Sequence, residues 1–234
     1  MFTIDPVALV RFDLRKSGEF VDFWGSHYKY RIADEDSGHA IDYYSEINLG
    51  SDLTSSNVLR LLRWKSPQYL SRVRASGPNS GTVNPRVQKV LKRIGSLNDF
   101  RAKRIDEATF DVVATSIFPT DGTVWKTFLK HCSRPLEFPI VDQHVHRAFN
   151  YHRGRHPDAI VDYTAYQDYF ESIHENVLGR FPYLDELHTR KLVDNALMAF
   201  GQFLKQYGPA YPLVQVPSPH EASTNQSGAE PDRR

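Results

Sequence analysis

The chain has 234 residues, 40% of them hydrophobic, which is enough to bury a substantial core in one domain or in one domain of two lobes. Its single cysteine, Cys132, excludes an intrachain disulfide and excludes a zinc or iron–sulfur site held by cysteines alone. The sequence has no run of 18 apolar residues and no signal-peptide pattern, so we expect a monomeric cytoplasmic protein that does not bind membranes.

Positive charge is concentrated in the middle of the chain, although the formal net charge is only +1. Residues 56–104 contain twelve Lys and Arg and a single acidic residue, Asp99. A basic block of this kind is typical of a surface that meets a polyanion, whereas a smaller excess would indicate ordinary solvated helix faces. We favour the polyanion interpretation because the imbalance is large.

Helix signals run through the first half of the chain. Asp5 followed by Pro6 is typical of a helix start, whereas the turn-forming composition of 33–51 predicts a loop. Pro85 is a second start signal, and Gly95 is expected to end that helix. The helices predicted in this half cover residues 19–31, 56–64, 67–73 and 85–94.

The second half continues the same pattern. Its predicted helices cover residues 106–118, 123–132, 141–152, 164–178 and 182–207. No segment alternates between apolar and polar residues with period two, so the sequence predicts an all-α fold. The polar, proline-containing residues 213–234 are expected to form a disordered tail.

Two short motifs lie between the helices of the second half. Residues 118–122 read Phe-Pro-Thr-Asp-Gly and join two predicted helices. Residues 138–142 read Phe-Pro-Ile-Val-Asp and lead into the helix that carries His144, Val145 and Arg147. Because proline does not continue a helix comfortably, 138–141 is predicted to be extended, with Asp142 at the helix start.

Together these motifs resemble the helix-hairpin-helix DNA glycosylases, in particular endonuclease III and the adenine glycosylases, over about thirty residues from Phe118 to Phe149. The family carries Leu-Pro-Gly-Val-Gly in its hairpin. This chain keeps the apolar residue, the proline and the last glycine, Gly122, which is expected to adopt a positive φ. It replaces the first glycine by Thr120 and adds Asp121, whose charge would weaken binding to a phosphate.

The resemblance implies a two-lobed helical fold without the iron–sulfur cluster of those enzymes. One lobe would cover 52–138 and contain the hairpin. The other would combine 1–51 with 139–212, and DNA would lie over the groove between them.

The resemblance also implies that Asp142 is the catalytic residue. Cleavage of an N-glycosidic bond builds positive charge on the sugar, which a carboxylate stabilises while it orients or deprotonates the attacking water. Bifunctional members of the family attack the sugar with a lysine. When the match is continued from the hairpin without a gap, Val124 occupies the position of that lysine. Lys126 lies two residues further, about 200° around the helix. We therefore favour a monofunctional enzyme that leaves an abasic site, with lyase activity through Lys126 as the alternative.

Other residues are expected to contact DNA or the flipped base. The candidates at the hairpin are Gly122, Thr123 and Val124, and those near Asp142 are His144 and Arg147. In the family, the wedge that fills the gap left by the flipped base often follows an early helix. Trp64, Lys65 and Gln68 lie at the end of the equivalent helix here and are candidates for that wedge or for the walls of the base pocket. Trp64 could equally be a core residue, and Arg147 could pair with an acid instead of a phosphate. Tyr43 and Tyr44 are further candidates for stacking on the base. We expect no cofactor and no metal, because the ten histidines are dispersed.

The base itself is not specified by the sequence. A damaged base would indicate DNA repair, and a modified base of a phage genome would indicate antiviral defence. Two alternatives from other classes are a non-catalytic helix-hairpin-helix DNA-binding protein and a helical protein-interaction domain that does not bind DNA.

Overall fold

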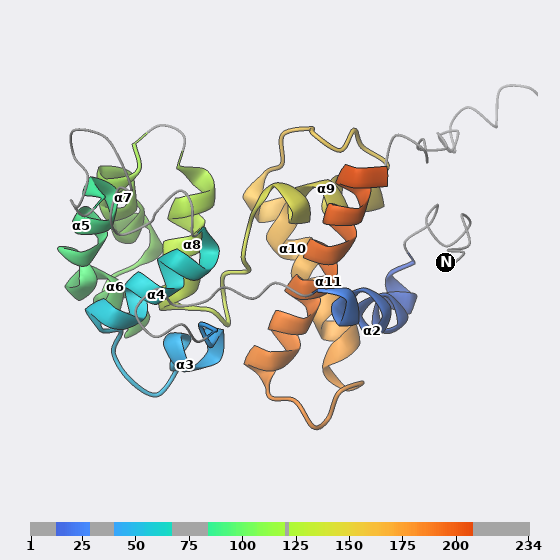
Figure 1. Cartoon of the computed structure of the whole chain (residues 1–234), viewed down its shortest axis with the longest axis horizontal. Helices are drawn as coiled ribbons and strands as arrows, with labels where there is room; N and C mark the ends of the chain where they lie inside the picture. The colour runs from blue at the N-terminus through green and yellow to red at the C-terminus, as the bar shows by residue number, and fades with distance from the viewer. Residues whose placement is uncertain (1–12, 29–39, 67–83, 120–121, 208–234) are drawn as a thin grey trace, which may run out of the picture.

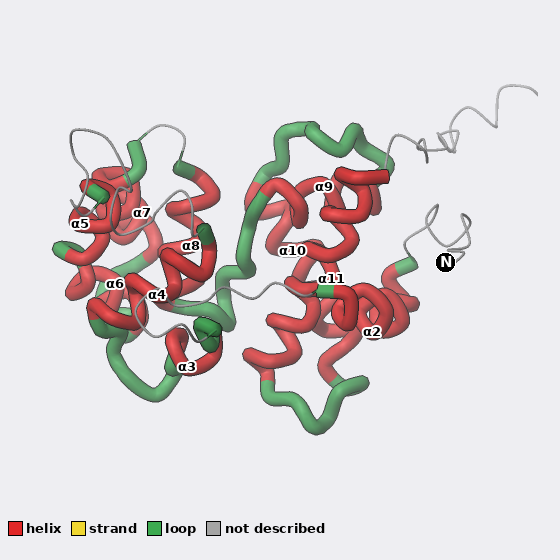
Figure 2. Tube along the Cα trace, in the orientation of Figure 1, coloured by secondary structure: helices red, strands yellow, loops and turns green. Residues whose placement is uncertain are grey.

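The computed structural model describes residues 13–28, 40–66, 84–119 and 122–207 (Figure 1). These residues form helices and connecting loops, and no β-strand occurs within them (Figure 2). The all-α prediction is therefore confirmed. None of the helices in these ranges combines the length and the apolar composition needed to cross a bilayer.

The helices fall into two groups, which lie side by side in Figure 1. We call the group on the left the first lobe. Its helices are α3 (Tyr43–Ile47), α4 (Ser55–Lys65), α5 (Pro85–Leu91), α6 (Ile94–Arg101), α7 (Glu107–Ile117) and α8 (Thr123–Ser133). Their buried side chains form one hydrophobic core, which also receives Leu187 from the other lobe.

The second lobe combines the two ends of the described chain. It contains a 3-10 helix (Leu14–Lys16), α2 (Ser17–His27), α9 (Gln143–His152), α10 (Tyr163–Leu178) and α11 (Glu186–Tyr207). The long helix α11 packs against α2, α9 and α10. Gly201 allows the close approach of α11 to α9, because a Cβ at this position would fall far inside contact distance of the His144 carbonyl oxygen.

The chain crosses from one lobe to the other immediately before Asp142. Ile140 is buried in the first core and Val141 in the second, so two successive residues belong to different cores. The backbone of Asp142 is extended, and the residue caps α9. The predicted helix start is therefore confirmed, and the crossing places this carboxylate at the junction of the lobes.

Helix α3 lies inside the stretch that was predicted to be a loop. Asp42 caps it by accepting a hydrogen bond from the backbone N–H of Tyr44, and Tyr43 and Ile47 are buried. These side chains pack in the core of the first lobe, against α4. The first lobe therefore begins near residue 41, whereas the sequence placed residues up to 51 with the other lobe.

Helix α6 was also not predicted, because Gly95 was interpreted as a stop. The preceding helix, α5, ends at Leu91, and Gly95 lies in the first turn of α6. A glycine inside a helix costs about 1 kcal/mol relative to alanine. Complete burial of Leu97 and Phe100 in the first core contributes about 1.5–3 kcal/mol for each side chain, which outweighs that cost. The predicted helices at Asp5 and 67–73, and the predicted tail, lie outside the described residues.

Candidate active site

A pocket of about 430 Å³ lies where the two lobes meet. This volume is within the range of small-molecule sites. Helices from both lobes form its walls. The principal lining residues are Trp64 and Lys65 of α4, Val124 and Trp125 of α8, Asp142, Gln143 and His144 at the start of α9, and Asp194 and Met198 of α11. Five of the residues proposed from the sequence therefore meet at one cavity, namely Trp64, Lys65, Val124, Asp142 and His144.

Asp142 lines this pocket, and its two carboxylate oxygens have different partners. Oδ1 accepts hydrogen bonds from the backbone N–H groups of His144 (2.7 Å) and Val145 (3.1 Å), as expected of a helix N-cap. Oδ2 lies 3.5 Å from Nζ of Lys65, and the side chain is only 16% exposed. Oδ1 is thus held by the helix, which leaves Oδ2 for a ligand.

The environment of Asp142 favours its ionised form. Burial alone would raise the pKa of this carboxyl, but the charge of Lys65 and the N–H groups of Val145 and His144 oppose burial and lower the pKa below its ordinary value. Asp142 is therefore an anion at neutral pH, in a site that is largely shielded from water.

Lys65 forms part of the pocket wall. Its Nζ donates a hydrogen bond to the Val141 carbonyl (3.0 Å) in addition to facing Asp142, and its side chain is 8% exposed. The sequence offered Lys65 as either a wedge or a wall residue. Because the ammonium is engaged by the second lobe at two points, Lys65 lies in the pocket wall of this structure and does not protrude as a wedge would.

Trp64 is a core residue that also borders the pocket. Its ring packs against Tyr43 at 5.0 Å and lies parallel to the ring of Phe128 at 6.4 Å between centroids. Tyr43 itself is buried and its hydroxyl bonds to Nε2 of His131 (2.5 Å). Tyr44 stacks on His188 of α11, with 3.9 Å between ring centroids. Neither tyrosine is a lining residue, so their proposed contact with the base is not supported by this geometry.

The hairpin glycine is required for space and not for a left-handed backbone. Gly122 has φ of −95°, which corrects the expectation of a positive value. A Cβ on Gly122 would lie 2.9 Å from the Phe118 carbonyl oxygen and closer still to the Phe118 Cβ. Thr123 is exposed at the start of α8 and Val124 lines the pocket. Residues 120–121 lie outside the described part of the chain.

Three other candidates lie away from the pocket or cannot be placed. Lys126 is half-buried on α8 and is not a lining residue, whereas Val124 is. Arg147 donates a hydrogen bond to Asp158 (3.3 Å). It therefore pairs with an acid, which was one of the two interpretations that the sequence allowed. Gln68 lies outside the described residues.

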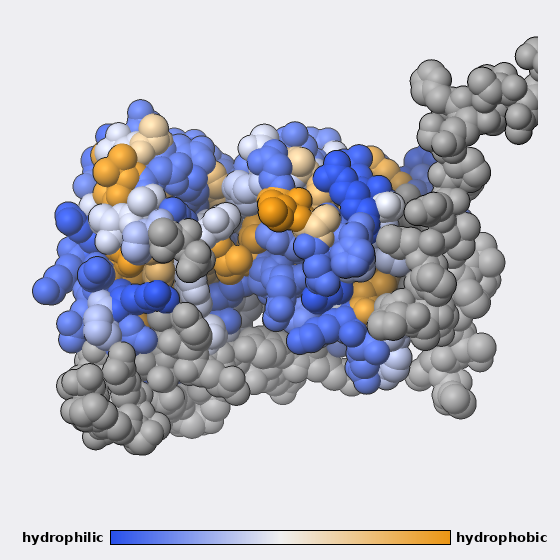
Figure 3. Space-filling view, turned by 90° about the horizontal axis from the view of Figure 1, so that it is seen from above, coloured by the Kyte–Doolittle hydropathy of each residue, from blue (hydrophilic) through white to orange (hydrophobic). Residues whose placement is uncertain are grey.

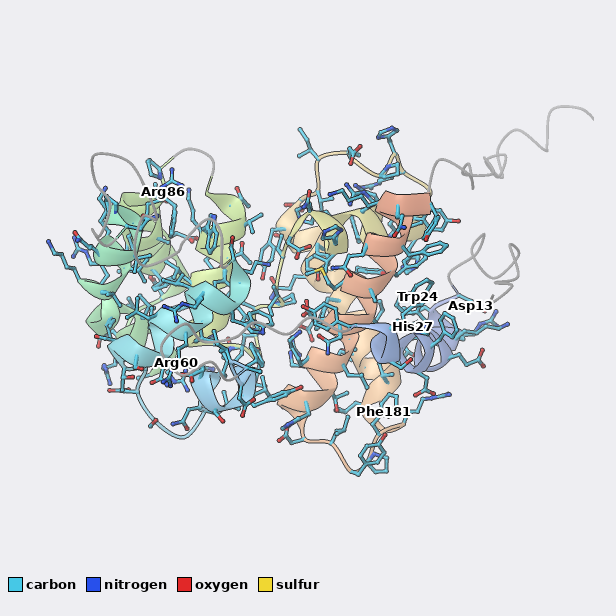
Figure 4. The ribbon with its side chains drawn as sticks, in the orientation of Figure 1. Asp13, Trp24, His27, Arg60, Arg86 and Phe181 are labelled. Carbon is cyan, nitrogen blue, oxygen red and sulfur yellow. The ribbon has the colours of Figure 1, made fainter. Side chains whose placement is uncertain are left out.

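The members of the basic block that the structure describes do not all lie at the surface. Arg63 is buried, and Arg101 donates to the carbonyls of Ile47 and Cys132. The members exposed on α5 and in the turn after it are Arg86, Lys89, Lys92 and Arg93. Arg86 lies at the upper edge of the first lobe in Figure 4. Seen from above, hydrophilic residues cover most of the visible described surface, with hydrophobic patches between them (Figure 3). Because Arg63 is buried and Arg101 donates to backbone carbonyls, only part of the described basic block is available to a polyanion.

No protein-family model, curated protein or solved structure matches this chain. The resemblance to DNA glycosylases therefore stays a hypothesis that depends on the residues quoted for it. Within the described ranges, no three His, Cys, Asp or Glu side chains are grouped as metal ligands would be.

A buried ion pair on α11 was not predicted from the sequence. Asp194 accepts a hydrogen bond from Lys191 Nζ at 2.6 Å, and both side chains are almost completely buried. The ammonium also lies 5.1 Å from the ring centroids of Tyr28 and Trp64. The spacing of three residues marks a possible helix pair. Its burial could not be read from α11 alone, because the aromatic rings come from distant parts of the chain.

Proposed function

We propose that the protein is a monofunctional DNA glycosylase, which hydrolyses the bond between a flipped base and its deoxyribose and leaves an abasic site. The observation that carries this proposal is the position of Asp142. An ionised, shielded carboxylate stands at a base-sized pocket between two helical lobes, as the resemblance requires of the catalytic residue.

The proposed reaction uses Asp142 mainly as a fixed negative charge. As the bond from the sugar to the base breaks, the base leaves with the bonding electrons and positive charge develops on the sugar. Oδ2 of Asp142 stabilises that charge and orients a water molecule toward C1′. A carboxyl whose pKa is lowered is a weak general base, so electrostatic stabilisation contributes more than proton abstraction.

The absence of lyase activity is supported by the lining of the pocket. Val124 occupies the position of the family's lysine and borders the cavity, whereas Lys126 does not. Lys65 is the one lysine among the described lining residues, and it is engaged by Asp142 and by the Val141 carbonyl. Water is therefore the proposed nucleophile.

Excision assays with Asp142→Asn test the catalytic role. Asparagine is as good an N-cap as aspartate, so the variant should fold and bind DNA. We expect its rate of abasic-site formation to fall by about 10²–10³, which is the usual effect of removing one preorganised electrostatic group. Asp158→Asn, which changes an exposed carboxylate of the same lobe, is the control. Equal rates for Asp142→Asn and the wild type would refute the proposal.

Borohydride trapping tests the monofunctional assignment separately. We expect no covalent adduct between the protein and DNA, because a Schiff base needs a lysine at the sugar. An adduct that disappears in Lys126→Ala, or in Lys65→Ala, would show that the enzyme is bifunctional and would identify its nucleophile.

A non-catalytic DNA-binding protein is the second candidate. It is favoured by Asp121 in the hairpin and by the loss of part of the basic block to internal contacts. It predicts salt-dependent binding to DNA without alkali-sensitive abasic sites, which the same assays would detect.

A further inference from the structure

One ammonium group stands beside the proposed catalytic carboxylate. Lys65 and Asp142 both line the pocket, and Nζ of Lys65 lies 3.5 Å from Oδ2 of Asp142. The lysine side chain is 8% exposed, and its Nζ also donates to the Val141 carbonyl at 3.0 Å. The same Nζ lies 5.8 Å from the centroid of the Phe128 ring, which belongs to the first lobe. Contacts in both lobes therefore fix this charge before a ligand binds.

This pairing keeps Lys65 close to any base whose sugar meets Asp142. Reacting groups approach to about 3–3.5 Å before reaction. If Oδ2 comes that close to C1′, its separation from Nζ keeps the ammonium within about 9 Å of the nitrogen that joins the base to the sugar. Unit charges at this distance, with an effective dielectric constant of about 20, interact strongly enough to change a rate about tenfold or more. Lys65 therefore need not touch the base to influence its departure.

The reaction creates a negative charge as well as a positive one. When the bond breaks, a neutral base takes the bonding electrons and becomes an anion, while the sugar becomes cationic. Water then adds to C1′ and loses a proton, which is taken up by the base or by solvent. A nearby ammonium attracts the departing anion. It also repels the charge on the sugar, but that repulsion is the same for every base.

We propose that the ammonium of Lys65 stabilises the negative charge on the departing base, so that the enzyme is suited to neutral bases that leave as anions. The inference rests on the proposed function, because it takes Oδ2 of Asp142 as the group at the sugar. Bases made cationic by alkylation leave as neutral molecules and gain nothing from this charge. The alternative is that Lys65 only holds Asp142 in place, which would affect the release of every base alike.

Three bases that leave with different charges separate these interpretations. Duplex oligonucleotides would carry uracil, 5-fluorouracil, which forms a more stable anion, or 7-methylguanine, which is already cationic in DNA. Single-turnover release would be measured with excess protein at a pH at which Asp142 is ionised, after subtraction of the uncatalysed rate. In Lys65→Met we expect the rate for uracil to fall at least about tenfold more than the rate for 7-methylguanine, with 5-fluorouracil between them.

The comparison is made between bases within one variant, so a change in folding or in the position of Asp142 cancels. Lys65→Arg keeps a cation and should retain most of the wild-type ratio of uracil release to 7-methylguanine release. Lys16→Met removes an exposed ammonium of the second lobe and should change none of the rates.

Binding of a base anion gives a readout without catalysis. The protein would be saturated with a duplex containing tetrahydrofuran, an abasic analogue that leaves the space for the base empty, and then titrated with 5-fluorouracil at increasing pH. We expect the affinity to rise at least about tenfold as the base ionises, because the ammonium attracts the anion. Lys65→Met should abolish this rise, whereas Lys65→Arg should retain it. Trp64 and Trp125 line the pocket, so their fluorescence would report binding.

The outcomes separate the inference from the function on which it rests. An equal fall in the rates for uracil and 7-methylguanine, or an affinity for 5-fluorouracil that does not depend on its ionisation, would overturn the role of Lys65 and leave glycosylase activity standing. Binding of the anion without release of any base would keep the interaction with the base and remove catalysis. Failure to release any base, together with failure to bind 5-fluorouracil or the tetrahydrofuran duplex, would refute both.

Discussion

Lys65 and Asp142 contact each other across the boundary between the lobes. Lys65 ends α4 of the first lobe, and Asp142 caps α9 of the second, with 3.5 Å between Nζ and Oδ2. The same ammonium holds the Val141 carbonyl at 3.0 Å. One cation therefore fixes the carboxylate, lowers its pKa and ties the linker between the lobes to α4.

Removal of this cation should make Asp142 easier to protonate. In Lys65→Met, burial of the carboxyl is no longer opposed by a nearby charge, so the pKa of Asp142 should rise. We expect the acid limb of the pH–rate profile to move to higher pH and the free energy of unfolding to fall by about 1.5–3 kcal/mol at neutral pH. Abasic-site formation and chemical denaturation as functions of pH would measure these changes.

The lowered pKa of Asp142 also determines how the free energy of unfolding depends on pH. The pKa of Asp142 is lowered in the folded protein, so its stabilisation is present above the pKa of the unfolded chain and is lost as the pH falls through the folded value. Lys65→Met should therefore flatten the acid decline in stability. Lys126→Met, on a half-buried lysine away from the pocket, serves as the control, and an identical flattening in that variant would contradict the assignment.

Gly201 should tolerate no side chain, because it faces the backbone of α9. In Gly201→Ala the new methyl group would collide with the His144 carbonyl, and neither helix can move without disturbing the start of α9. Overpacking of this kind costs about 1–3 kcal/mol. We expect a lower melting temperature and a loss of activity through displacement of Asp142.

Gly95→Ala is the matched control for this substitution. Gly95 also lies in a helix, but its Cβ would meet no atom within 4 Å. Because alanine is the better helix former, this variant should be stabilised by up to about 1 kcal/mol with unchanged activity. Equal stabilisation of Gly201→Ala would show that α9 and α11 are further apart than described here.

The parts of the site that the sequence predicted are those that depend on local chemistry. Pro139 excludes a continuing helix and Asp142 is a good N-cap, so the position of the carboxylate followed from neighbouring residues. The role of Lys65 as its partner did not, since 77 positions separate the two residues. Only the packed lobes bring the end of α4 to the start of α9.

The α11 pair shows a second limit. On a helix, Lys191 and Asp194 have the spacing of an ordinary solvated ion pair. Both are buried because Tyr28, Tyr43 and Trp64 surround the ammonium, and these rings come from the C-cap of α2, from α3 and from α4. A pattern within one helix carries no information about rings supplied by others, so the burial of this ion pair could be found only in three dimensions.

The buried His131 and the half-buried His152 should make the protein acid-sensitive. Burial lowers the pKa of His131 and of His152 to about 3, so both are neutral in the folded protein. The pKa of an unfolded histidine is near 6.5. Below that pH the unfolded chain takes up a proton that the folded protein does not, so each histidine lowers the free energy of unfolding by about 1.4 kcal/mol per pH unit as the pH falls toward 3. Denaturation between pH 7 and 5 would measure this slope. His152→Gln should reduce it, whereas His156→Gln, on an exposed site, should not.

The exposed cations of α5 should contribute to any affinity for DNA. Lys89 is exposed on α5, and Lys16 is exposed in the 3-10 helix of the second lobe, so the two offer matched single-charge substitutions. If α5 meets the phosphate backbone, Lys89→Gln should weaken binding of a tetrahydrofuran duplex and reduce the slope of log K against log salt by about 0.9. Lys16→Gln should leave the slope unchanged. If Lys89→Gln leaves the salt slope of DNA binding unchanged, the DNA lies on another face of the first lobe. If the wild-type protein has a salt slope of zero, it does not bind DNA electrostatically.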